Sequence, residues 1–358
     1  MIFQSRAVQE PRAHLAFAFD INDAAVFKRE RMVQGLAGSV THLDTPCSAM
    51  RLHAAGGVHH ISPKIIEKFA LANDPCNRCT RADANSYVQR VRTMLQFYIA
   101  TLHNLRSKWP NAWPGMPVVL NACIQRLWPH KRPEVGSTSH KLLQAALAMA
   151  SHMEQVAQEA DYEPLYHNRL HTADALTAIC LLIQALQKKN IVVDDEWAAA
   201  FLFAVTSHDV LHPGGANGFL QELERRSAKE MQYIATPLGI DVVWLQRVRE
   251  LILRTDPTLV AANHDFVKDR PFEMNLDWAC VLINEADILA SATSIYGPEL
   301  GQSLAQEWAL KNHPLHQVVG TSKGRLQFLS SLRFSSPAAE AFQIARDVAA
   351  QIASLREA

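Results

Sequence analysis

The stretch from residue 171 to residue 210, HTADALTAICLLIQALQKKNIVVDDEWAAAFLFAVTSHDV, decides the fold class. Its apolar runs show no repeated alternation with polar residues, and they have the length of helices rather than strands. Asn190 ends the first predicted helix, about His171 to Lys189, and the second spans Asp194 to Val210. Pro213-Gly214-Gly215 then stops the second helix. The stretch therefore predicts two successive helices.

The helical pattern continues on both sides of this stretch. Ser139 is the predicted N-cap of a helix through Ala160. Before residue 135 one helix stands out, from about Asn85 to Leu105, with apolar residues at helical spacing. Further helices are predicted near Glu222–Ile234, Val242–Thr255, Leu276–Ser291, Gly297–Asn312 and Pro337–Arg356. The predicted class is all-α, a compact multi-helix bundle with short connections.

A polar stretch rich in helix breakers, PHKRPEVGSTS at residues 129–139, is the predicted linker. It divides the chain into an N-terminal helical region, residues 1–135, and a second domain, residues 136–358. Trp109, Trp113 and Trp128 fit core positions, so the first region is expected to be a helical cap on the second. A regulatory or dimerising module is the alternative, which leaves a homodimer open.

Composition limits the classes of partner. The 358 residues are 48% hydrophobic and 20% charged, with 35 Lys+Arg against 35 Asp+Glu. Zero net charge argues against attraction of the whole protein to nucleic acid or an anionic membrane. The N-terminus lacks a signal-peptide core, and no apolar run reaches membrane-spanning length. We therefore expect a cytoplasmic protein without a membrane or nucleic-acid polymer as partner. Cys76 and Cys79 form a lone CxxC, expected to be ordinary reduced thiols.

Three segments combine histidine with acidic residues. They are YHNRLHTAD at residues 166–174, SHDVLHPG at residues 207–214 and EAD at residues 285–287. If the first segment opens a helix, His167 and His171 lie four apart on one face. Asp287 belongs to an apolar predicted helix, where a carboxylate is costly unless it is paired or binds a metal. A single histidine on such helices is more often a core or surface residue, but three segments together favour a metal site.

Two imidazoles and two carboxylates, from His171, His208, Asp209 and Asp287, suit a divalent ion. An oxygen of Asp209 could bridge to a second ion held mostly by water, as magnesium and manganese prefer. Two such ions lower the pKa of a bridging water and bind both oxygens of an in-line displacement at phosphorus. The sequence therefore predicts a two-metal hydrolase of a phosphodiester.

At these residues the chain resembles the class I cyclic-nucleotide phosphodiesterases, a branch of the HD-type metal phosphohydrolases. The resemblance extends over about residues 140–345. YHNRLHTAD looks like the family's YHNxxHAxD, and HDVLHPGGANGFL looks like HDxxHPGxxNxFL. It implies the family's helical fold and a 3′,5′-cyclic-nucleotide phosphodiesterase that forms the 5′-monophosphate by attack of a metal-bridging hydroxide. It also implies Zn²⁺ at the first site, Mg²⁺ or Mn²⁺ at the second, and a cyclic nucleotide as substrate.

The resemblance further implies a role for each matched residue. The first-metal ligands would be His171, His208, Asp209 and Asp287. Asp209 would also contact the second metal, and His167 and Asp287 would form the catalytic set. In that set, His167 would be the general acid that protonates the departing ribose oxygen. The residues that orient these groups or hold water on the second metal would be Asn168, Asp174, His212 and Glu224. Phe328 resembles the aromatic residue that holds the base.

The chain departs from the family pattern at several positions, of which the most important is in the base pocket. Leu211 replaces an Asp, Arg226 replaces a His, and the interval before the LERRSA segment is short. Arg325 stands where the family has its purine-reading Gln, while Gln327 is displaced by two positions. Arg has only donors, which suit guanine acceptors or a phosphate. Arg325 and Gln327 are therefore candidate substrate-binding residues. A hydrolase of another phosphodiester (a cyclic dinucleotide or an alkyl or aryl ester) and a non-catalytic nucleotide sensor stay as alternatives.

Overall fold

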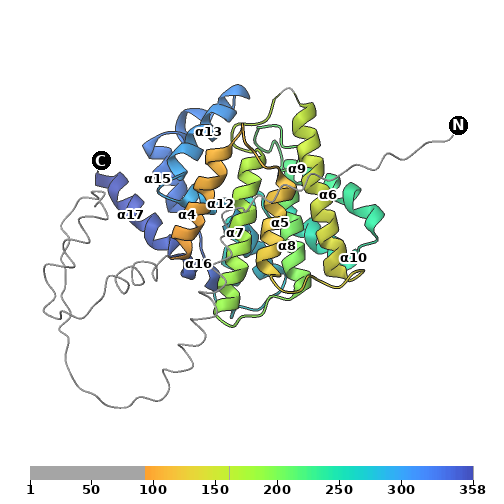
Figure 1. The fold of residues 1–358 in the computed structure, drawn as a ribbon. Helices are drawn as coiled ribbons and strands as arrows, with labels where there is room; N and C mark the ends of the chain where they lie inside the picture. Colours follow the sequence, from red (N-terminus) through yellow and green to blue (C-terminus); the bar gives the residue numbers. More distant parts are fainter. Residues whose placement is uncertain (1–92, 161, 358) are drawn as a thin grey trace, which may run out of the picture. The chain divides into compact units, whose positions relative to one another are not determined.

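The computed structural model describes residues 93–160 and 162–357, which form helices and contain no strand (Figure 1). In chain order these are α4 (Met94–Lys108), α5 (Met116–Leu127), α6 (Thr138–Glu159), α7 (Arg169–Lys188), α8 (Asp195–Ser207), α9 (Glu222–Ala235), the 3-10 helix η1 (Thr236–Leu238), α10 (Val242–Leu253), α11 (Pro257–Val267), α12 (Leu276–Ala292), α13 (Gly297–Leu310), α14 (His316–Val319), α15 (Ser322–Ser331), α16 (Pro337–Phe342) and α17 (Ile344–Glu357). The predicted all-α class is confirmed.

Helix α7 lies inside the core because apolar residues cover most of its circumference. It packs against α4, α5, α8, α12 and α16, and α4 and α5 run beside it in Figure 1. Its neighbour α8 is buried at every position from Trp197 to Ser207. Among the described helices, α7 alone is long and apolar enough to cross a membrane, but 83% of that window is buried inside the fold. Burial on all sides is what a core helix of a bundle requires.

Polar caps set where the helices begin. Asp194 accepts a hydrogen bond from the Trp197 backbone N–H at 2.7 Å, so α8 begins as predicted. The predicted cap of α6, Ser139, is wrong by two residues. Ser137 accepts from the His140 N–H at 3.2 Å, while Ser139 is buried within the first turn. Both serines offer the same hydroxyl, and packing decides between them.

Three predicted helices have different limits in the structure. Helix α4 begins after Thr93, whose side chain and that of Gln96 form a capping box; residues 85–92 of the predicted helix lie outside the described residues. Helix α8 ends at Ser207 rather than Val210, because residues 208–211 form a turn. The predicted helix Pro337–Arg356 is two helices, since Gln343 adopts a left-handed conformation with φ 56°.

The sequence analysis missed helices α5, α11, α14 and α15. Two of them carry a proline in the first turn, Pro117 in α5 and Pro257 in α11. Proline is favourable there because the first N–H groups of a helix have no intrahelical partner. Pro110, Pro114 and Gly115 precede α5 and do not interrupt it.

The described helices before residue 135 share the core of the later ones. Helix α4 packs on α7, and α5 packs on both α6 and α7. Trp113 and Trp128 are half-buried against this core. Packing is therefore continuous across residue 135. The domain boundary expected at this residue stays a prediction for the part of the N-terminal region before residue 93. Cys76 and Cys79 lie outside the described residues.

Helix α12 connects the central helices to the C-terminal ones. It packs against α7, α8, α10, α11, α13 and α17, and it is buried along nearly its whole length. A polar side chain on α12 therefore faces another helix in most directions. This position lets α12 contribute a carboxylate to groups from α7 and α8.

Candidate metal and catalytic site

Two imidazoles and two carboxylates converge between α7, α12 and the residues that follow α8. The Nε2 atom of His171 lies 2.9 Å from Asp287 Oδ1 and 3.3 Å from Asp209 Oδ2. The Nε2 atom of His208 lies 3.2 Å from Asp209 Oδ2 and 3.4 Å from Asp287 Oδ1. We call these four residues the four-residue cluster. His171, His208 and Asp287 offer ligand atoms that all lie within 4.8 Å of one another, close enough to hold a metal ion.

The hydrogen bonds of His208 test whether this cluster fits a cation. Its Nδ1 lies 2.7 Å from the Val205 carbonyl oxygen, and because a carbonyl only accepts, Nδ1 must donate. The buried Nε2 has no hydrogen-bond partner and faces the carboxylates of Asp209 and Asp287. In the neutral ring, a lone pair would face two negative groups unless a cation lay between them. The donor set therefore fits a divalent ion, with the second ring nitrogen held by the backbone as metal-binding histidines usually are.

The charges within the four-residue cluster also indicate a site for a cation. Burial by itself would lower the pKa of His171, but hydrogen bonds to Asp209 and Asp287 outweigh it and raise the pKa to about 9. Burial by itself would also lower the pKa of His208, but the negative charges of Asp209 and Asp287 raise it. Burial by itself would raise the pKa of both carboxyl groups, yet the two imidazoles lower the pKa of Asp209 and of Asp287. Two ionised carboxylates in a buried place demand positive charge, which protons or a divalent ion can supply.

The sequence analysis expected His167 and His171 on one helix face, but His167 lies before the helix that carries His171. Helix α7 begins only at Arg169, because the Asn168 side chain accepts hydrogen bonds from the backbone N–H groups of Leu170 (3.0 Å) and His171 (3.1 Å). Asn168 is thus an N-cap, which fixes where the helix starts. His167 comes just before it, and its ring centroid lies 6.0 Å from that of His171. The two rings are neighbours across a cap rather than along a helix face.

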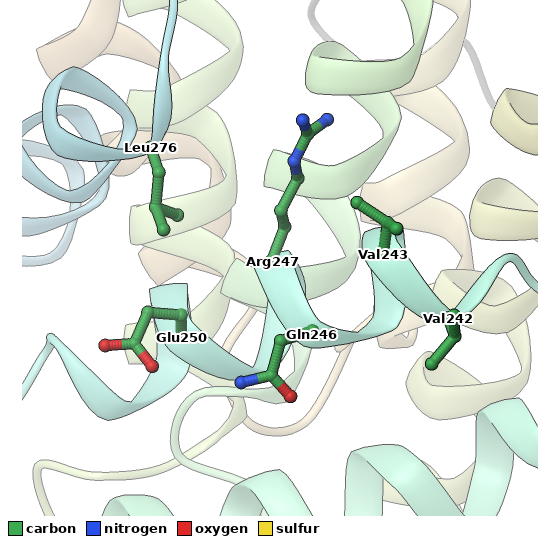
Figure 2. A pocket seen from close by; sticks show the side chains of 6 residues that line it. All are labelled: Val242, Val243, Gln246, Arg247, Glu250 and Leu276. Carbon is green, nitrogen blue, oxygen red and sulfur yellow. The ribbon is translucent and has the colours of Figure 1, made fainter.

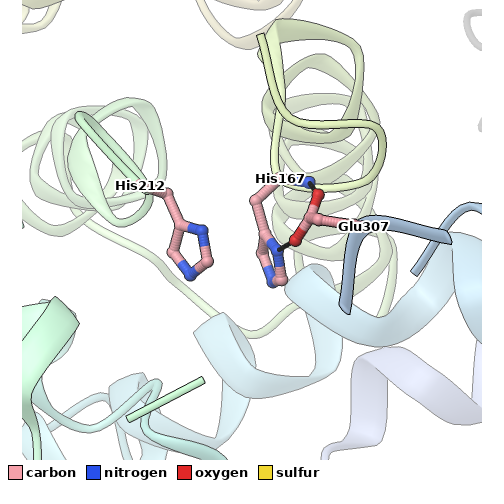
Figure 3. A group of neighbouring side chains, drawn as sticks. All are labelled: His167, His212 and Glu307. Carbon is pink, nitrogen blue, oxygen red and sulfur yellow. Dashed lines mark hydrogen bonds and ion pairs between the residues drawn. The ribbon is translucent and has the colours of Figure 1, made fainter. Parts of the chain in front are cut away.

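Glu307 of α13 is the partner of His167, and the sequence analysis missed it (Figure 3). Its Oε1 lies 2.5 Å from His167 Nδ1, and its Oε2 accepts from the backbone N–H groups of Tyr166 and His167 at 2.7 and 3.0 Å. Glu307 is fully buried. Burial raises the pKa of its carboxyl group, but the hydrogen bond and charge of His167 lower it further, so Glu307 is ionised. The carboxylate holds His167 Nδ1–H, which leaves Nε2 as the nitrogen that can present a proton to a substrate.

His212 stacks on His167, as Figure 3 shows, with ring centroids 3.8 Å apart and planes inclined by 25°. Its Nδ1 accepts a hydrogen bond from the Gly214 N–H at 3.1 Å. Burial and the charge of His167 lower the pKa of His212 to about 3. His212 is therefore a neutral ring stacked on His167, and its orienting role stays a prediction.

A family comparison covers this part of the chain. Residues 166–234 match the family model of the 3′5′-cyclic nucleotide phosphodiesterases. This match supports a class I cyclic-nucleotide phosphodiesterase domain in the chain. The match includes His167, His171, His208 and Asp209 but not Asp287, and it is shorter than the resemblance over residues 140–345 expected from the motifs. No curated protein matches the chain. The family indicates 3′,5′-cyclic-nucleotide phosphodiesterase activity.

Within this phosphodiesterase domain, Asp174 holds α4 rather than a ligand of the cluster. Arg106 of α4 donates to both of its carboxylate oxygens, at 2.8 and 2.5 Å. The Tyr98 hydroxyl donates to its backbone oxygen at 3.2 Å. Asp174 lies one turn beyond His171 on α7. It can therefore affect the orientation of His171 only by fixing the position of α7. Sequence spacing could not identify this partner, since Arg106 is 68 residues away.

Glu224 of α9 belongs to a polar group beside the cluster. The Asn217 amide donates to both Glu224 oxygens, at 3.2 and 2.9 Å, and to Asp256 Oδ2 at 3.2 Å. Burial raises the pKa of Glu224, and the charges of Asp256 and Asp209 raise it further. The charge of Asp209 reaches Glu224, and the role of Glu224 at a second metal stays a prediction. Asn217 and Asp256 were not predicted, although Asn217 lies in the quoted motif.

The predicted base-pocket residues all come from α15. Phe328 is half-buried against the core, and Gln327 is exposed. The Arg325 guanidinium lies 5.6 Å from the centroid of the Phe328 ring, but its hydrogen bonds go to the carbonyl oxygens of Ser291 and Thr293. The structure therefore directs Arg325 to the end of α12, which was not expected from its position in the motif.

A separate surface hollow of about 480 Å³ lies on α10 (Figure 2). Its lining is formed by Val242, Val243, Gln246, Arg247, Glu250 and Leu276. No histidine lines it, and it includes no member of the four-residue cluster. The cluster between α7 and α12, rather than this hollow, is the candidate catalytic site.

Proposed function

We propose that this domain hydrolyses a 3′,5′-cyclic nucleotide to the 5′-monophosphate with two divalent ions, Zn²⁺ at the first site and Mg²⁺ or Mn²⁺ at the second. The observation that carries the proposal is the convergence of His171, His208, Asp209 and Asp287, with contacts of 2.9 to 3.4 Å. These four residues would hold the first ion, and Asp209 and the polar group around Glu224 would serve the second. When bound, the ions supply Lewis acidity at phosphorus and lower the pKa of a water between them.

The residues of the chain supply the remaining chemistry. Opening the cyclic phosphodiester leaves a negatively charged ribose oxygen, which must gain a proton. His167 would donate that proton from Nε2, because the Glu307 carboxylate holds Nδ1 at 2.5 Å. His212 keeps the ring in one plane by stacking on it. The acid therefore has a fixed direction before the substrate arrives.

The test is an assay of chelator-treated protein reloaded with Zn²⁺, Mg²⁺ or Mn²⁺, on cyclic AMP and on cyclic GMP. Wild-type protein should form the 5′-monophosphate. The His167→Ala variant should lose at least about a hundredfold in kcat, the scale of general acid catalysis. His103→Ala, at an exposed position of α4, is the matched control and should keep wild-type activity. Metal-loaded wild-type protein that hydrolyses neither nucleotide would refute the proposal.

A second function, hydrolysis of another phosphodiester, is favoured by one observation. Arg325 occupies the family's purine-reading position but bonds to the carbonyl oxygens of α12, so no base reader stands at that position. The same metal-loaded protein should then turn over a cyclic dinucleotide or bis(p-nitrophenyl) phosphate faster than cyclic AMP or cyclic GMP. Strong turnover of the cyclic mononucleotides with poor turnover of these esters excludes this alternative.

A further inference from the structure

Arg325 reaches the end of α12 through a space that only a glycine leaves open. A Cβ atom at Gly297 would lie 2.2 Å from Arg325 Nη2 and 2.4 Å from the Ser291 carbonyl oxygen. Real Cβ atoms essentially never come within 3.0 Å of other heavy atoms. Gly297 is the first residue of α13, so the guanidinium lies where α12 ends and α13 begins. The side chain is thus built into the packing of three helices.

The guanidinium caps carbonyl groups that α12 cannot satisfy itself. The last carbonyl groups of a helix lack intrahelical partners and carry partial negative charge. Arg325 Nη1 donates to the Ser291 oxygen, and Nη2 donates to the Thr293 oxygen at 3.0 Å. Nη2 also donates to Gln351 Oε1 at 2.6 Å, and Gln351 Nε2 donates to the Ala292 oxygen at 2.9 Å. Arg325 and Gln351 together bind three successive carbonyl oxygens.

This end of α12 is connected to the catalytic residues by a short path. Ser291 lies four residues after Asp287, on the same face of the helix. Its hydroxyl lies 2.8 Å from the Tyr166 hydroxyl. The Tyr166 ring lies 4.7 Å from the His167 ring and 4.8 Å from the His171 ring, centroid to centroid. A shift of the α12 end would therefore move Tyr166, the neighbour of both the acid and a metal ligand.

We propose that Arg325 is a positioning residue, which fixes the C-terminal end of α12 and through Ser291 and Tyr166 the orientation of His167, and that it does not read the base. The inference rests on the proposed function in that the affected reaction is cyclic-nucleotide hydrolysis. The contacts of Nη1 and Nη2 support it, because they are made to backbone oxygens and to Gln351 before any substrate binds.

Steady-state kinetics of Arg325→Met and Arg325→Lys on cyclic AMP and cyclic GMP test the proposal. Misplacing catalytic groups lowers kcat, so Arg325→Met should lose about tenfold or more, with KM changed less than about twofold. Lys also donates to carbonyl oxygens, so Arg325→Lys should recover part of the loss. The ratio of kcat/KM for the two nucleotides should stay within about twofold. Lys323→Met, exposed on the same helix, is the control.

A change of about fivefold or more in KM or in that ratio, with kcat retained, would overturn the proposal because it identifies a substrate contact. Combining Ser291→Ala with Arg325→Met should cost less than the sum of the two single losses, since both act on one path. Fully additive losses would contradict the path through Ser291.

Hydrogen exchange separates failure of this inference from failure of the proposed function. In Arg325→Met, amide exchange should become faster at residues 289–296 and at residues 163–168, and stay unchanged in α5 and α10. This readout needs no substrate, so it holds even if the wild-type protein hydrolyses neither nucleotide. Unchanged exchange at residues 163–168 would contradict the inference. If Arg325→Met does not fold, Arg325→Lys and Gln351→Ala give the same comparison.

Discussion

Helix α12 needs positive charge at two places, and the chain supplies a permanently charged side chain at only one of them. At its C-terminal end, the guanidinium of Arg325 donates to the carbonyl oxygens of Ser291 and Thr293. At Asp287, the neighbours are a second carboxylate and two imidazoles, which are positive only when they are protonated. The difference teaches that folding alone neutralises the C-terminal end of α12, whereas a bound cation, a proton or a metal ion, must neutralise the carboxylates at Asp287. The permanently paired end of α12 and the cation site at Asp287 are thus about one helical turn apart.

The largest expected effect comes from removing the negative charge of Asp287. Asp287→Asn keeps the shape of the side chain but leaves one carboxylate among two imidazoles. We expect loss of the bound ion and a fall in kcat/KM of more than about a hundredfold, since even residues behind metal ligands change activity by ten- to a hundredfold. Metal content and the cyclic-nucleotide assay measure this. Asp277→Asn on the same helix is the control, and an Asp287→Asn protein with full metal content would contradict the expectation.

Metal binding should also stabilise the fold, and only through the cluster. A ligand that binds the folded state at a hundred times its Kd adds about 2.7 kcal/mol to the free energy of unfolding. Chelator-treated wild-type protein should gain about that much when zinc is restored, measured by urea denaturation. Arg325→Met should keep the gain and Asp287→Asn should lose it. Equal gains in both variants would mean that zinc binds elsewhere.

His264 is a buried imidazole without a carboxylate partner. Its pKa is shifted in the opposite direction to that of His171, so its contribution to stability should depend on pH in the opposite sense. Burial lowers the pKa of His264 on α11 to about 4, with the charge of Arg333 adding to the effect, whereas the value in the unfolded chain is 6.5. The unfolded state therefore binds more protons below pH 6.5, so stability is present above this pH and is lost as the pH falls toward 4.

Between pH 7 and pH 5 this group should cost wild-type protein about 2 kcal/mol of unfolding free energy. Denaturation of His264→Gln, compared with wild-type protein at both pH values, should lack that part of the loss. His103→Gln, exposed on α4, should keep it. An identical pH dependence in His264→Gln and wild-type protein would show that His264 has the same pKa in the folded and unfolded states, and would contradict the expectation.

The smallest expected effect concerns Glu307. Glu307→Gln keeps a hydrogen-bond acceptor for His167 Nδ1 but loses the negative charge beside it. We expect kcat to fall about tenfold, with KM and metal content unchanged, because Glu307 acts behind the acid. Glu299→Gln on the exposed side of α13 is the matched control. Loss of bound metal in Glu307→Gln would instead place Glu307 within the metal site.

The sequence predicted the helices and the cluster where the signal is local. His167, His171, His208 and Asp209 lie in two short motifs, and the apolar run around Asp287 showed that this carboxylate needs a partner. Glu307 carries a weaker form of the same signal: it lies seven residues after Leu300, on one helix face that turns inward. Its partner could not be read from the chain, because His167 is 140 residues away.

The errors follow from tertiary packing. Ser137 and Ser139 have equal capping ability, and only the burial of Ser139 shows which one caps α6. Arg325 was expected near the base from its place in a motif, yet its direction depends on the space beside Gly297 and on Gln351. Roles assigned by motif position hold only where the neighbouring helices leave the side chain free to turn toward the substrate.

The burial of α8 from Trp197 to Ser207 has a consequence for insertions and deletions. An α-helix turns about 100° per residue, so one residue added between Asp194 and His208 would rotate His208 and Asp209 by that angle away from α7. A helix buried on every side cannot rotate back without exposing apolar surface or forcing steric overlap. The number of residues in α8 is therefore as strictly constrained as the identity of the two side chains that follow it.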